Sequence, residues 1–128
     1  MSIEVVYNEQ YGGFSLSEAA AKRMAELGNE EAIEEVKRIK EERERLLEEW
    51  EKKLLKECIT DIWDFYLEKT PRHDPILVQT VRELGLDKAS GGSCTLKIKT
   101  LKGNRYIIRE CDGAEWIVEP DDMKWIHV

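Results

Sequence analysis

One segment constrains the fold more than any other, because residues 29–69 contain no glycine and no proline. These 41 residues hold 14 acidic and 9 basic side chains, a net charge of −5, and the rest of the chain carries only −2. Acid-first pairs four residues apart, such as Glu34–Arg38 and Glu41–Arg45, each stabilise a helix by about 0.3 kcal/mol. The segment therefore predicts one long, charged helix over residues 29–69.

The two halves of this predicted helix differ in apolar content. Between Lys37 and Arg45 the only apolar residue is Ile39, whereas an apolar stripe begins at Leu46. At 1.5 Å per residue the helix would be about 60 Å long, against a radius of gyration of about 14 Å for a globule of this chain length. An unbroken helix must therefore project, or lie against a second copy in a homodimer; a break near Arg43 is the alternative.

Two short helices are expected on either side of the long one. Ser15 precedes the first, and Glu18 three residues later completes a capping box, so this helix should run from Leu16 to Leu27. Asp74 as N-cap and Pro75 at the first helical position open the second helix, which should run over Pro75–Leu84. Gly28 and Gly85 follow these helices and suit their C-terminal ends.

Strands are expected at both ends of the chain, where β-branched and aromatic residues alternate with polar ones. The predicted strands cover residues 2–7, 94–99, 105–110, 115–119 and 123–128. Turns at Gly103-Asn104 and Asp112-Gly113 would join the later strands into an antiparallel meander. We predict a single α+β domain over residues 1–128, with a mostly antiparallel sheet, two short helices and one long charged helix.

Composition excludes several functional classes. No apolar run approaches the roughly 18 residues that span a bilayer, and Met1–Glu4 does not resemble a secretory signal. The three cysteines form no C-x-x-C motif, so we expect a reduced, cytoplasmic protein with no metal site and no cofactor. The formal net charge of −7 argues against nucleic acid as a partner.

Several short blocks, in this order, resemble a family of short uncharacterised proteins from tailed phages and large DNA viruses. They are residues 11–17 (YGGFSLS), 71–78 (PRHDPILV), 83–85 (ELG), 89–91 (ASG), 96–98 (LKI), 106–110 (Y-x-I-x-E) and 112–115 (DG-x-E). The resemblance covers residues 3–28 and 70–119. The region between the first two blocks varies in that family and here holds the long helix, and Cys111 stands where an aromatic residue is usual. The resemblance implies a viral accessory protein in a host cytoplasm, and it carries no known activity or catalytic residue.

The starts of the two short helices form the candidate ligand site, because helix N-termini present free N–H groups and favour anions. The residues concerned are Tyr11, Gly12, Gly13, Phe14 and Ser15 at the first start, and Arg72, His73 and Asp74 at the second. Brought together, they would line a pocket suited to a small anionic, nucleotide-like ligand. In the structural alternative, the glycines permit a turn, Ser15 and Asp74 only cap helices, and Arg72 pairs with an acid.

The sequence supports three functions. We expect a non-enzymatic accessory protein that binds a host protein or a small anionic ligand. One alternative is a small enzyme acting on a nucleotide or phosphate ester through Arg72 and His73, but Cys58, Cys94 and Cys111 offer no activated nucleophile. The other is a structural homo-oligomer organised by the long helix.

Overall fold

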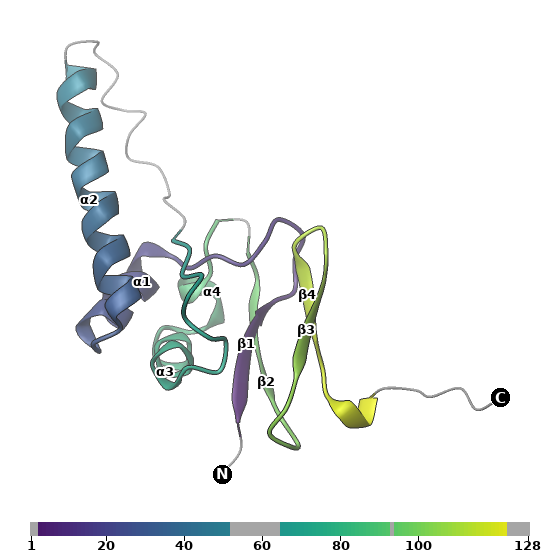
Figure 1. The fold of residues 1–128 in the computed structure, drawn as a ribbon. Coiled ribbons are helices and arrows are strands. Elements are labelled where there is room, and N and C mark those ends of the chain that lie inside the picture. Colours follow the sequence, from purple (N-terminus) through teal and green to yellow (C-terminus); the bar gives the residue numbers. More distant parts are fainter. Residues whose placement is uncertain (1–2, 52–64, 93, 123–128) are drawn as a thin grey trace.

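The computed structural model describes residues 3–51, 65–92 and 94–122 (Figure 1). The fold class is α+β, as predicted. Its elements are β1 (Glu4–Asn8), α1 (Glu18–Glu26), α2 (Glu30–Glu51), α3 (Pro75–Leu84), α4 (Leu86–Ala89), β2 (Leu96–Thr100), β3 (Ile107–Cys111), β4 (Ala114–Val118) and the 3₁₀ turn η2 (Pro120–Asp122).

The strands form two antiparallel two-stranded sheets, β1–β2 and β3–β4. In Figure 1 the β1–β2 sheet lies between α1, α3 and α4 on one side and the β3–β4 hairpin on the other. Val5 and Val6 explain this arrangement, because both are fully buried and point to opposite faces of β1. Val6 belongs to the core under the helices, and Val5 packs with Ile117 of β4 in a second, smaller core.

The strand pairing differs from the predicted meander. β2 pairs with β1, with Val5 opposite Lys99 and Val6 opposite Ile98, and it forms no ladder with β3 within the described residues. The physical reason is that β1 is apolar on both faces and must be covered on both, by the helices on one side and by the β3–β4 hairpin on the other. The hairpin therefore packs against a face of β1, and β2 forms the ladder with β1. The predicted last strand, residues 123–128, lies outside the described residues.

The long charged helix is present as α2, but it does not extend over all of residues 29–69. Phe65 is extended, and its backbone exchanges two hydrogen bonds with Leu16, at 2.9 and 3.0 Å. Residues 66–69 are also not helical, and 52–64 lie outside the described residues. Phe65 is 1% exposed, so burial in the core outweighs the helical preference of the surrounding charged sequence.

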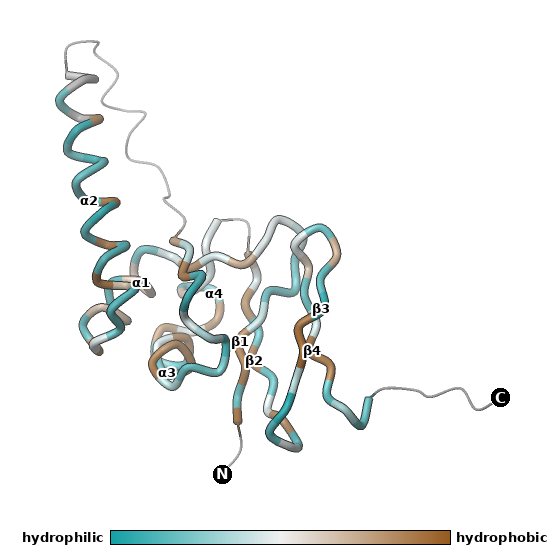
Figure 2. The backbone as a smooth tube through the Cα atoms, in the orientation of Figure 1, coloured by the Kyte–Doolittle hydropathy of each residue, from teal (hydrophilic) through white to brown (hydrophobic). Residues whose placement is uncertain are grey.

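α2 packs on α1 through one narrow stripe. Ala32 and Ile39 are buried and Val36 packs beside them, at the spacing of one helical face. The rest of the helix is mainly charged and hydrophilic, and its later half extends away from the remaining elements (Figures 1 and 2). The prediction of a long charged helix is therefore confirmed over Glu30–Glu51, where the helix is unbroken at Arg43.

The start of α1 is also corrected. Ser17, not Ser15, is the N-cap, and its Oγ accepts a hydrogen bond from the Ala20 N–H at 3.2 Å. Leu16 forms single β-bridges to Phe65 and Ser90, so the chain is still extended there. Helix α3, in contrast, begins and ends at the predicted residues, with Asp74 accepting from the Leu77 N–H at 3.3 Å.

Candidate functional site

Arg72, the cation of the predicted ligand site, is paired inside the protein. Its Nη1 and Nη2 donate to Oε1 and Oε2 of Glu115 at 2.6 and 2.9 Å. The Glu115 side chain is only 5% exposed, and the guanidinium carbon of Arg72 lies 3.5 Å from the ring centre of Phe14. The forked donor that was expected to hold an anion is therefore matched by a carboxylate of the protein itself.

The two predicted corners do adjoin, because Phe14 and Arg72 are in contact. The backbone of the Gly12-Gly13 loop, in the first corner, makes a different contact. Gly12 N donates to the carbonyl oxygen of Asp112 at 3.1 Å, in the turn of the β3–β4 hairpin. Tyr11 beside them is 70% exposed. The loop therefore contacts the hairpin turn. Of its two aromatic residues, Tyr11 is exposed to solvent and Phe14 lies against Arg72.

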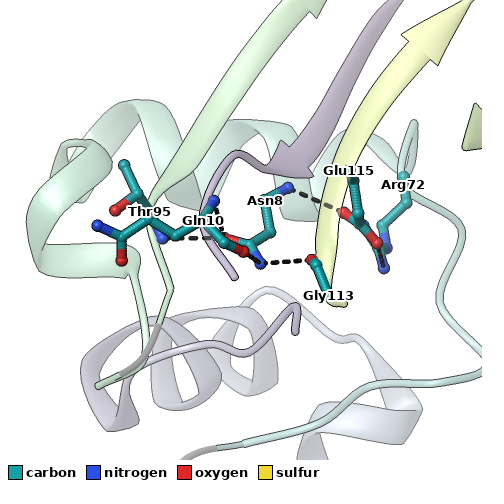
Figure 3. Close-up of polar contacts among 6 residues, drawn as sticks. All are labelled: Asn8, Gln10, Arg72, Thr95, Gly113 and Glu115. Carbon is teal, nitrogen blue, oxygen red and sulfur yellow. Dashed lines mark hydrogen bonds and ion pairs between the residues drawn. The ribbon is translucent and has the colours of Figure 1, made fainter. Parts of the chain in front are cut away.

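A buried polar network extends from Glu115 to Asn8, as Figure 3 shows. Asn8 N donates to Glu115 Oε1 at 2.8 Å, and Asn8 Nδ2 donates to the carbonyl of Gly113 at 2.9 Å. Asn8 Oδ1 accepts from the Thr95 N–H at 3.0 Å and from the Gln10 N–H at 3.1 Å. Asn8 is fully buried, so these bonds satisfy groups that would otherwise be costly to bury.

Sequence reasoning did not select Asn8 or Glu115, although a signal for Glu115 exists. In the predicted strand around it, Glu115 alternates onto the same face as Ile117, which is the core face. An acid on a core face requires a buried cation or several donors. Arg72 provides the cation and the Asn8 backbone provides a donor.

Ser15 and Asp74 serve the fold. Ser15 is 2% exposed, its carbonyl accepts from the Gly91 N–H at 3.2 Å, and its Oγ has no hydrogen-bond partner among the described residues. Asp74 caps α3. The ligand-binding role of these two residues, and of Tyr11, Gly12, Gly13, Phe14 and Arg72, stays a prediction.

A hollow of about 610 Å³ opens between β1 and α3, on the His73 side of the second corner. It is lined by Ile3, Glu4, His73, Pro75, Val78, Gln79, Arg82 and Glu83. His73 is therefore the one predicted site residue among the side chains that line this hollow. Its size is in the range that holds small molecules or a large side chain of a partner.

His73 is held in place by Tyr106. The imidazole Nδ1 lies 2.7 Å from the Tyr106 hydroxyl, and the two rings meet edge to face with centroids 5.7 Å apart. Burial of the phenol raises the pKa of Tyr106, so this hydroxyl keeps its proton at neutral pH. With Nδ1 engaged, Nε2 is the imidazole atom left for a bound group.

The charges at the rim of the hollow are neutralised in pairs. Arg82 pairs with Glu4, and Arg23 Nε donates to Glu83 Oε2 at 2.7 Å. The hydrogen bond from Arg23 lowers the pKa of Glu83, which therefore stays ionised and paired. What remains for a ligand is an apolar surface formed by Ile3, Pro75 and Val78, with His73 beside it.

Other chemistry has little support in the part of the chain that the structure describes. No three side chains among the described His, Cys, Asp and Glu residues gather to hold a metal ion. Cys94 is buried, and burial raises the pKa of its thiol, whereas Cys111 is exposed on β3. Cys58 lies outside the described residues. None of the described helices has the length and apolar character of a membrane span.

Comparison with known proteins identified no relative: no family model, no curated protein and no solved structure matches the chain. The interpretation of the site therefore rests on its geometry.

Proposed function

We propose that this chain is a non-enzymatic accessory protein of viral or phage type, and that it binds its partner or ligand through the hollow between β1 and α3. The bound group would be apolar and would carry one hydrogen-bonding atom. The resemblance of the sequence blocks supports the viral part of this proposal. The apolar lining of the hollow, with the His73 imidazole beside it, supports the binding part.

The pairing of Arg72 with Glu115 is the observation that favours an apolar group over an anion. An anionic ligand at Arg72 would have to displace a buried carboxylate that also accepts the Asn8 N–H. Displacement would leave Glu115 charged and without its cation, which costs about 3 kcal/mol. In the hollow, Arg82 is likewise already paired with Glu4.

The lining of the hollow also favours binding over catalysis. Among the described residues that line it, no serine, threonine or cysteine could act as a nucleophile beside His73. The two carboxylates of the lining, Glu4 and Glu83, are each paired with an arginine, so neither is free to orient the imidazole.

Two small probes of similar shape, phenol and toluene, test this proposal by NMR titration. Both should shift the amide signals of the residues that line the hollow, and phenol should bind more tightly because its hydroxyl can bond to His73. Gln79 is exposed on α3, so Gln79→Trp fills the hollow without changing the core and should abolish both shifts. Lys37→Trp, which adds the same ring on exposed α2, is the matched control. His73→Phe should remove the preference for phenol only.

Other outcomes would contradict the proposal. Shifts that survive Gln79→Trp would place binding elsewhere. A rise in melting temperature with AMP or ATP that Arg72→Met abolishes would support the anion site instead. Hydrolysis of p-nitrophenyl phosphate that His73→Ala removes would support the enzyme. An oligomer in a native mass spectrum of freshly purified protein would support the structural homo-oligomer instead.

A further inference from the structure

The outer face of the β3–β4 hairpin is a second surface with unusual composition. In the antiparallel register, Ile107 lies opposite Val118, Arg109 opposite Trp116, and Cys111 opposite Ala114. These six residues share one face, because side chains alternate along each strand. The other face carries Ile108 and Ile117, which pack toward β1 in the smaller core.

Two large apolar side chains are exposed on this outer face. Trp116 is 46% exposed and Ile107 is 42% exposed, and the register places them on diagonal positions of the hairpin. Figure 2 shows hydrophobic segments midway along the hairpin, on the side of the molecule away from α2. A partner that covered this tryptophan and the isoleucine beside it would remove apolar surface from water, which favours binding.

Arg109 is the only charged residue among these six, and it lies directly across from Trp116. Its side chain is exposed and makes no hydrogen bond or ion pair within the described residues. Residues 94–110 around it hold five basic residues and one acid. The face is therefore apolar with a local positive charge, although the whole chain carries a formal charge of −7.

We propose that this outer face, formed by Ile107, Arg109, Trp116 and Val118, is a docking surface for a partner-protein segment that presents a large apolar side chain beside a carboxylate. Tryptophan and arginine are the residues that most often dominate protein interfaces, and arginine binds a carboxylate with two parallel hydrogen bonds. The apolar side chain would lie on Trp116 and Ile107, with the carboxylate on Arg109.

A protein partner fits this face better than a nucleic acid does. Single-stranded nucleic acids bind to several stacked aromatic residues in a positively charged groove. Here one tryptophan is flanked by the aliphatic residues Ile107 and Val118, so this face offers one ring for stacking and not several. This surface is separate from the hollow between β1 and α3, so its test does not depend on the proposed function.

Selection from a displayed library of random short peptides, with the full chain as bait, tests the docking surface. Enriched peptides should carry Asp or Glu next to a large apolar residue. A synthetic copy of an enriched peptide should bind about tenfold more tightly than its Asn/Gln version, the usual gain from one charge-assisted contact. Trp116→Thr should weaken binding about 30-fold, as loss of an interface hot spot does.

Reversal of the charge at Arg109 is the most specific test of the docking surface. Arg109→Glu should lose the acidic peptides and select basic ones from the same library. Lys88→Glu on α4 changes the net charge by the same amount at an exposed position off the hairpin and should leave binding unchanged. Glu110→Gln, also exposed but on the opposite face of β3, is a second control. Unchanged melting temperatures would show that each variant is folded.

Several results would overturn the docking surface. They are an absence of enrichment, peptides that still bind Arg109→Glu, and tight binding of a labelled oligothymidine that Arg109→Glu abolishes. A native-mass dimer that Trp116→Thr turns into a monomer would show that a second copy occupies the face. Binding that arises only after removal of residues 123–128 would show that the chain's own end occupies it.

Discussion

Gly12, Gly13 and Gly113 illustrate how single residues determine this fold. All three have positive φ angles, of 116°, 92° and 91°. At Gly113 the backbone of the other two passes so close that an added Cβ would lie 2.2 Å from Gly13 N and 2.7 Å from Gly12 N. The diglycine loop therefore lies directly against the hairpin turn at Gly113.

Gly113→Ala should therefore destabilise the protein by at least about 2 kcal/mol, because it adds both backbone strain and a clash between two backbones. Gly13→Ala is the matched control, since its φ is also positive but nothing lies within 4 Å of the added Cβ. Gly13→Ala should destabilise the protein by about 1 kcal/mol, which is the cost of backbone strain without a clash. Urea unfolding measures both, and equal costs would contradict the close approach.

At the scale of the elements, α1 and α2 form a helical pair joined by an ion pair as well as by apolar contact. Arg43 Nη1 and Nη2 donate to the two carboxylate oxygens of Glu18 at 2.7 and 3.0 Å. The hydrogen bond from Arg43 lowers the pKa of Glu18 from 4.5 to about 2. Arg43 lies about one helical turn beyond the buried Ile39, so this ion pair extends the contact between the two helices.

The lowered pKa of Glu18 predicts a pH dependence. A carboxylate with a folded pKa below its unfolded value stabilises the protein above the unfolded pKa, and that contribution is lost as the pH falls from 4.5 to about 2. Because the side chain is 35% exposed, we expect about 1 kcal/mol after screening by solvent. Glu18→Gln should lower stability by this amount at neutral pH, and should equal the wild type near pH 2. Glu34→Gln, on exposed α2, should show no such difference.

At the scale of the whole molecule, the Arg72–Glu115 pair joins parts that lie far apart in sequence. Glu115 belongs to β4, Arg72 lies before α3, and the Arg72 carbonyl also accepts from the Val6 N–H of β1 at 2.9 Å. The larger core lies under the helices, and the smaller one lies between β1 and the hairpin. This ion pair therefore holds the hairpin against the rest of the fold.

Arg72→Met should destabilise the protein by about 3 kcal/mol, because it leaves a buried carboxylate without its cation. The double variant Arg72→Met with Glu115→Met should be more stable than the sum of the two single changes predicts. Arg82→Met removes a more exposed arginine, paired with Glu4, and should cost less than about 1 kcal/mol. Chemical denaturation of the four variants gives these values, and additive costs would refute the coupling.

The sequence by itself determined the features that depend on neighbouring residues. The ends of α3 follow from Asp74, Pro75 and Gly85, because caps act within one helical turn. The charge pattern likewise predicted the helix that is seen over Glu30–Glu51. The α+β class followed from the two periodicities of the apolar residues.

Only the tertiary structure decided the features for which the local sequence offers several equal choices. Ser15 and Ser17 are both good caps, and the burial of Leu16 against Phe65 selects Ser17. Residues 65–69 could continue a helix, but Phe65 is more stable in the core. Arg72 could pair with many of the 27 acids, and the packing of β4 beside β1 selects Glu115. Burial brings together residues that are distant in the chain, so a local pattern can mark a core face but does not record which partner lies against it.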